Sequence, residues 1–147
     1  MARKIGKDER VQLLGSIWLF SHCDRKELAR ISALTTLQTA SAGDVLTEQG
    51  KPGSECFIVA SGTARVDVSG VDAGEIGPGA FFGEMALLDG GPRSATVTAL
   101  EDMQLLALDR RELDALLDVV PSVGRKMLRV AGQRLREAHD RHSPASG

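Results

Sequence analysis

The hydrophobic positions divide the chain into a helical beginning, a long stretch of short strands and a helical end. Between Val11 and Phe20 the apolar residues recur at helical spacing. A second helix is predicted after Asp24, because Asp24 and Glu27 have the spacing of a capping box and apolar residues follow on one face. From Leu37 to Leu108 glycines separate short apolar runs, and turns at this spacing predict a sandwich or barrel.

The helical pattern returns at Asp109, which repeats the capping spacing with Glu112 and precedes a stripe of leucines. Pro121 ends this helix and can open another. Apolar residues then recur at a period of 3.6 at Val123, Met127, Ala131, Leu135 and Ala138. The pattern predicts an α+β fold with two C-terminal helices, in a single domain over residues 1–140, followed by a disordered tail over 141–147.

Composition narrows the class of protein. The 147 residues are 42% hydrophobic and 26% charged, with a net charge of −2, which is typical of one globular domain without a strong field for nucleic acid or membrane. Cys23 and Cys56 are too far apart to suggest a zinc motif or a disulfide framework. We find no apolar run long enough to span a bilayer and no signal-peptide pattern. We therefore expect a cytoplasmic protein that binds neither membrane nor nucleic acid.

The stretch GEMALLDGGPRSATV, from Gly83 to Val97, carries the most distinctive chemistry. Gly83 allows a ligand to approach the backbone, and a helix start at Met85 would offer N–H groups to an anion. Arg93 has donors that suit a phosphate, whereas ionised Glu84 can only accept, as from a sugar hydroxyl. A phosphate beside a ribose hydroxyl describes a nucleotide. A single arginine without a GxxxxGK[ST] loop favours a phosphate with one charge, such as a cyclic phosphodiester.

These residues resemble the phosphate-binding cassette of the cyclic nucleotide-binding domain family. Its members include catabolite-activator proteins, protein kinase regulatory subunits and cyclic nucleotide-gated channels. The resemblance extends over roughly residues 17–137 and includes G-D-x-L-x-x-Q-G from Gly43, F-I-V-x-x-G from Phe57 and P-G-x-F-F-G-E from Pro78. It implies an eight-stranded antiparallel, jelly-roll-like β-roll flanked by N-terminal and C-terminal helices.

The resemblance also implies a role for each site residue. Glu84 would bind the ribose 2′-hydroxyl and Arg93 the cyclic phosphate, with no cofactor or metal. The remaining members of the implied ligand-binding set are Val66 and Met85 beside the purine, Ser94 with its hydroxyl, backbone groups near Ala86 and Ala95, and Phe82 and Gly83 in the preceding motif.

Two features bear on the base. In relatives that prefer cGMP a threonine often follows the phosphate-binding arginine; Ser94 stands there, so we expect cAMP to bind as well as cGMP or better. The family's C-terminal helix closes over the purine, and no aromatic residue follows Phe82. The candidates for this contact are Leu128, Arg134 and Leu135, of which Arg134 lies off the apolar stripe and can stack its guanidinium on the base.

Other patterns favour less specific interpretations. The last helix carries a basic strip at Arg125, Lys126, Arg129, Arg134 and Arg136, which we interpret as a solvated helix face rather than a nucleic-acid site. His22, His139 and His142 are interpreted as solvated, and we expect no enzyme activity because no nucleophile elbow is found. The favoured hypothesis, given the resemblance, is a stand-alone receptor module for cAMP that signals to a protein effector by moving its C-terminal helix. The alternative is an interaction or scaffold protein that keeps the fold without a nucleotide.

Overall fold

The computed structural model describes residues 5–129, apart from the side chains of Met85 and Leu88. In chain order the elements are α1 (Lys7–Gly15), a 3₁₀ turn η1 (Trp18–Phe20), α2 (Arg25–Leu34), β1 (Thr36–Ala40), β2 (Val45–Thr47), β3 (Glu55–Ser61), β4 (Ala64–Val68), β5 (Val71–Ile76), β6 (Phe81–Phe82), α3 (Glu84–Asp89), β7 (Thr96–Ala99), β8 (Met103–Asp109) and α4 (Arg110–Val119). Residues 121–129 are also helical and are called the C-terminal segment below.

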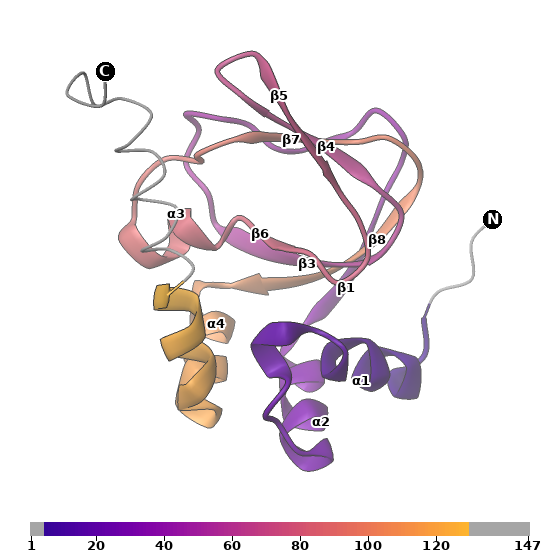
Figure 1. The fold of residues 1–147 in the computed structure, drawn as a ribbon, viewed down its shortest axis with the longest axis vertical. Helices are drawn as coiled ribbons and strands as arrows, with labels where there is room; N and C mark the ends of the chain where they lie inside the picture. The colour runs from indigo at the N-terminus through magenta and orange to yellow at the C-terminus, as the bar shows by residue number, and fades with distance from the viewer. Residues whose placement is uncertain (1–4, 130–147) are drawn as a thin grey trace, which may run out of the picture.

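The strands form two antiparallel sheets of four, in the orders β1-β8-β3-β6 and β2-β7-β4-β5. Figure 1 shows the sheets rolled over one another, with α1, α2 and α4 gathered outside the β1-β8-β3-β6 sheet and α3 beside the end of β6. The predicted α+β fold, a β-roll with flanking helices, is therefore confirmed.

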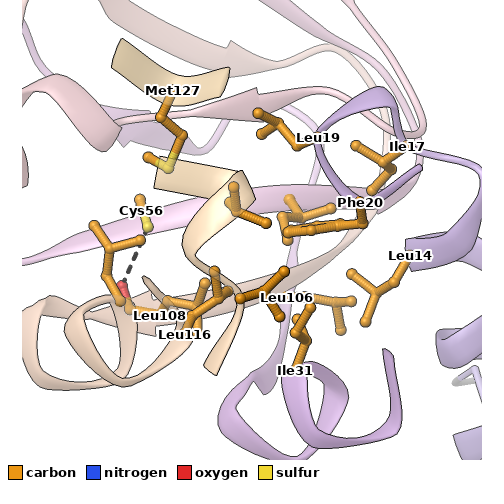
Figure 2. Close-up of a cluster of buried hydrophobic side chains, with 14 of the residues drawn as sticks. Leu14, Ile17, Leu19, Phe20, Ile31, Cys56, Leu106, Leu108, Leu116 and Met127 are labelled. Atoms are coloured by element: carbon orange, nitrogen blue, oxygen red, sulfur yellow. Dashed lines mark hydrogen bonds between the residues drawn. The ribbon is translucent and has the colours of Figure 1, made fainter. Parts of the chain in front are cut away.

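Two hydrophobic cores lie on opposite faces of the central strands β3 and β8. Met103, Leu105 and Ala107 face the interior of the roll, where they join residues from β4 and β7. Leu106 and Leu108 face the helices instead, and pack with residues of α1, α2 and α4 (Figure 2). Because both faces of β8 are covered, its sequence is almost continuously apolar instead of alternating.

Both predicted capping boxes form. Asp24 accepts a hydrogen bond from the N–H of Glu27, and Asp109 accepts one from that of Glu112, each at 2.8 Å. Such caps satisfy N–H groups that the first helical turn leaves without partners. Together they fix where α2 and α4 begin.

The predicted helix from Val11 to Phe20 is wrong at its end. The helix α1 stops at Gly15, and Ile17 is extended before the separate turn η1. A Cβ on Gly15 would lie 3.1 Å from Leu28, so a glycine here permits close packing of α1 on α2. The break redirects the chain so that Leu19 and Phe20 are buried in the core under the helices.

Candidate functional site

Gly83 marks the change from strand to helix at the start of the predicted cassette. Its φ of 84° lies in the left-handed region, where a residue with a side chain would be strained. A Cβ there would also lie 2.7 Å from the Arg93 guanidinium. Glycine at position 83 therefore permits both the turn into α3 and the approach of Arg93.

The Arg93 side chain folds back across the beginning of the cassette. Its guanidinium donates a hydrogen bond of 2.9 Å to the Gly83 carbonyl, and only 8% of the residue is exposed. Glu84, which follows Gly83, is 7% exposed. An acid and a base nine positions apart in the sequence are therefore both buried at one place.

The turn after β2, at residues 50–53, also contacts Arg93. Its backbone N–H donates to Lys51 at 2.8 Å and its carbonyl accepts from Gly50 at 2.9 Å. Gly53 lies directly against the Arg93 side chain: a Cβ at Gly53 would overlap the guanidinium carbon and Nε, and would lie 2.9 Å from Cδ. The absence of a side chain at position 53 thus permits the observed position of the guanidinium.

Arg93 and Glu84 both line a cavity of about 340 Å³ between the cassette and the β4–β5 side of the roll. This volume lies in the range of small-molecule sites, which is about 300–1,000 Å³. The predicted site residues that line it are Val66, Phe82, Gly83, Glu84, Ala86, Arg93, Ser94 and Ala95. The sequence thus brings the predicted polar groups and the predicted purine neighbour Val66 to one cavity.

Three of the predicted ligand contacts and candidates lie outside the described part of the structure. They are the side chain of Met85 and the whole of Arg134 and Leu135. Leu128, another candidate for covering the base, is 70% exposed and does not line the cavity. The identity of the residue over the purine therefore stays a prediction.

Burial dominates the electrostatics of this site. Loss of solvent lowers the pKa of Arg93, an effect that Cys56, Glu55 and Glu84 oppose. Burial likewise raises the pKa of the neighbouring Cys56 thiol to about 12, with a further increase from Glu84. With a pKa of about 12, the Cys56 thiol stays protonated at neutral pH.

A second, smaller cavity of about 200 Å³ shares Phe81 and Glu84 with the first. It is lined on its other sides by the turn η1 and by Met127 of the C-terminal segment. Glu84 therefore lies between the larger cavity and the helices.

Lys126 corrects the interpretation of the basic strip as a solvated face. It is 8% exposed, and its ammonium group donates hydrogen bonds of 2.8 Å to the Trp18 carbonyl and to Ser21 Oγ. The same ammonium lies 5.1 Å from the centre of the Trp18 ring. Lys126 thus ties the C-terminal segment to η1, while Arg125 and Arg129 are exposed as predicted.

The sequence did not identify Gly53 or Thr47 as site residues. The sequence pattern indicates only that Gly53 belongs to a turn between strands, because its KPGS context is a turn signal. Thr47 is buried and lines the larger cavity. A lone threonine in a strand carries no such signal, because its position depends on pairing with a distant strand.

Residues 5–129 contain no cluster of metal ligands, because no group of three or more His, Cys, Asp or Glu residues there could hold a metal ion. Nor does any helix there have the length and apolar character required to cross a bilayer.

Comparison with known proteins identifies the family. The model of the cyclic nucleotide-binding domain matches residues 37–119. A cyclic nucleotide-gated potassium channel from Mesorhizobium japonicum is 37% identical over 123 residues, which cover 84% of this chain and 34% of the channel. A cyclic AMP receptor protein from Thermus thermophilus is 41% identical over 101 residues, or 65% of this chain and 47% of that protein.

Solved structures agree with the fold. The Thermus thermophilus catabolite activator protein has a TM-score of 0.74 and 35% identity, covering 82% of this chain and 59% of that one. The regulatory domain of Toxoplasma gondii PKA, solved with cAMP, has a TM-score of 0.77 over 86% of this chain and 50% of that one. At 22% identity this second likeness concerns the fold alone.

The chain therefore belongs to the cyclic nucleotide-binding domain family. It spans about a third to a half of the length of the two curated relatives described above.

Proposed function

We propose that this chain is a cAMP receptor module that transmits binding through its C-terminal helix to a protein effector. The observation that carries the proposal is that Arg93 and Glu84, both buried residues, line the same cavity. A buried guanidinium suits an anionic phosphate, and a neighbouring carboxylate suits a ribose hydroxyl. The similarity to the cyclic AMP receptor protein from Thermus thermophilus supports this ligand class.

The proposal assigns the ligand by position in the cavity. The phosphate lies at Arg93 with Ser94 and Ala95, the ribose at Glu84, and the purine toward Val66. Because Ser94 follows the arginine where cGMP-preferring relatives often have threonine, the proposed preference is for cAMP over cGMP. A cytoplasmic location and the absence of a catalytic step also belong to the proposal.

The proposed moving part is the C-terminal segment. Met127 lines the smaller cavity, and Glu84 is shared between this cavity and the larger one. A shift of Glu84 toward a ribose would change packing at Met127 and at η1. Nucleotide binding at Glu84 would thus change the position of the C-terminal segment. A partner protein would then recognise the changed position of this segment.

Calorimetric titration with cAMP and cGMP tests the ligand. Arg93→Ala should weaken cAMP binding by about 2–4 kcal/mol, because it removes a charge-assisted contact from a mostly dry site. Glu84→Ala should weaken it by about 1–3 kcal/mol. The matched control is Arg65→Ala, because the Arg65 side chain is 47% exposed and pairs with Asp67 away from the cassette.

Each part of the proposal has a result that contradicts it. If Arg93→Ala changes cAMP affinity by less than about threefold, worth about 0.6 kcal/mol, the site assignment is wrong. Tenfold tighter binding of cGMP than of cAMP, about 1.4 kcal/mol, overturns the preference. If the wild type binds neither nucleotide, the scaffold hypothesis replaces the receptor. Hydrolysis of either nucleotide, detected by product analysis, would require an enzyme instead.

A further inference from the structure

The end of β2 is joined to the end of the cassette by a side chain as well as by the strand ladder. β2 pairs with β7 at Val45↔Thr98 and Thr47↔Val97, with a register shift between the two pairs. Near this irregularity the Thr47 hydroxyl donates a hydrogen bond of 3.0 Å to the Ala95 carbonyl. Thr47 is 6% exposed, so this bond forms away from bulk solvent.

Neighbouring bonds make this connection part of a larger brace. The backbone N–H of Gln49 donates to Thr96 Oγ1 at 3.0 Å, next to the bond from Thr47. The Arg93 backbone accepts a hydrogen bond from the Gly50 N–H and donates one to the Lys51 carbonyl, as described above. Residues 47–51 are therefore hydrogen-bonded to residues 93–96. Residues 94 and 95 form the bend between Arg93 and β7.

We propose that the Thr47 hydroxyl is a positioning group for the phosphate-binding end of the cassette. The inference rests on the proposed function, because it assumes that an anionic phosphate lies at Arg93, Ser94 and Ala95. Thr47 lines the same cavity as these three residues. It acts through the Ala95 peptide, which would contact the ligand, and not as a ligand contact itself.

The chemistry of an anion site explains why this carbonyl needs a donor. A carbonyl oxygen carries partial negative charge and repels a phosphate, whereas a backbone N–H attracts it. The Thr47 hydroxyl fixes the direction of the Ala95 carbonyl and satisfies its lone pair. Without that donor the bend between Arg93 and β7 can rotate, so the backbone donors of Ser94 and Ala95 are no longer held in one arrangement.

The test uses two substitutions at one position in the full chain. Thr47→Val keeps the shape of the side chain but removes the hydroxyl, and Thr47→Ser keeps the hydroxyl but removes a methyl group. By calorimetric titration we expect Thr47→Val to weaken cAMP binding by about fivefold to tenfold. Thr47→Ser should stay within about twofold of the wild type, because the donor is retained.

A matched control separates positioning from a general loss of stability. Thr35 is also buried, and its hydroxyl donates to the Ser32 carbonyl at 2.7 Å, but it lies at the end of α2 and does not line the cavity. Thr35→Val removes the same kind of hydrogen bond, and also the acceptor of a 3.4 Å hydrogen bond from the Arg10 guanidinium. We expect it to lower the thermal unfolding midpoint and to leave cAMP affinity unchanged.

Phosphorothioate analogues of cAMP provide a second measurement, the ratio of two affinities, which a loss of stability alone would not change. The Rp and Sp diastereomers carry sulfur in place of different exocyclic phosphate oxygens. If Thr47 orients the phosphate end, Thr47→Val should change the ratio of the two affinities by about threefold or more.

The outcomes distinguish this inference from the proposed function. Binding by the wild type with equal cAMP affinity in Thr47→Val overturns the positioning role and leaves the receptor intact. Weaker binding in Thr47→Val with an unchanged Rp-to-Sp ratio also overturns it, because the effect would then be structural. No nucleotide binding by the wild type rejects the proposed function, and the role of Thr47 with it.

Discussion

At the scale of single residues, the position of Arg93 depends on two neighbouring glycines that have no side chain. The guanidinium rests against Gly53 and Gly83, which come from different parts of the chain, and donates to the Gly83 carbonyl. A buried arginine loses rotamer freedom, and this loss opposes folding by up to about 2 kcal/mol. Close packing on both sides means that the position is set before a ligand arrives, so binding need not include the cost of ordering it.

Gly53→Ala tests this packing with one methyl group. The new Cβ would overlap the Arg93 guanidinium, so the side chain must leave its position. We expect cAMP affinity to fall by about tenfold, about 1.4 kcal/mol. In an Arg93→Ala background the same methyl group meets no guanidinium, so its effect should disappear, which a double-mutant cycle by calorimetry would show.

Gly77→Ala is the matched control for Gly53→Ala. A Cβ at Gly77 would make ordinary contact with Thr63 at 3.7 Å, and Gly77 does not line the larger cavity. It should therefore leave cAMP affinity unchanged. Equal affinities for Gly53→Ala and the wild type would mean that Arg93 binds phosphate from another position.

At the scale of elements, the sequence predicts what is local and misses what depends on distant pairing. The caps of α2 and α4 follow from residues three apart, and the cassette is contiguous, so both were found. The end of α1 depends on how closely Gly15 approaches Leu28, and the role of Thr47 depends on the register of β2 with β7. Such contacts leave no periodic signal in the sequence.

The burial of Lys126 is a further case of distant pairing. Helical spacing alone puts it among exposed basic residues, but its hydrogen-bond acceptors are Trp18 and Ser21, more than a hundred positions earlier. A buried ammonium loses hydration and needs such acceptors. The contact links η1 to the C-terminal segment, the proposed moving part.

Lys126→Met should loosen the C-terminal segment. Methionine keeps an unbranched apolar stem but cannot donate to the Trp18 carbonyl or to Ser21. We expect amide hydrogen exchange over residues 121–129 to accelerate by more than about tenfold, since each of the two lost hydrogen bonds to the charged group contributes about 1.5–3 kcal/mol. Exchange in β8, buried on both faces, should not change.

Arg125→Met serves as the control on the same segment, because Arg125 is exposed. It removes a positive charge without removing either contact to η1. If the two variants exchange at the same rate over residues 121–129, the contact of Lys126 with η1 does not hold the segment.

At the scale of the whole molecule, two cores share strands β3 and β8, and Cys56 lies in the core between the sheet and the helices. Cys56 is fully buried among residues of the helices and the β1-β8-β3-β6 sheet, and its thiol donates to the Leu108 carbonyl at 3.6 Å (Figure 2). Its neighbour Phe57 faces the other core, inside the roll. Water reaches this thiol only when the helices separate from the sheet, which couples its titration to unfolding.

This coupling predicts how stability depends on pH. In the folded state burial raises the pKa of Cys56 from 9.0 to about 12, so the folded protein keeps a proton that the unfolded chain releases. The free energy of unfolding should then be unaffected by this group below about pH 9 and fall by about 1.4 kcal/mol per pH unit from there toward pH 12. Urea denaturation at several alkaline pH values would measure the decline. Cys56→Ala should lower stability at neutral pH through the lost packing, but it should remove the alkaline decline that the Cys56 thiol causes. Cys23→Ala should retain this decline, because Cys23 is only partly buried. Parallel slopes for the wild type and Cys56→Ala above pH 9 would mean that the thiol already meets solvent in the folded protein.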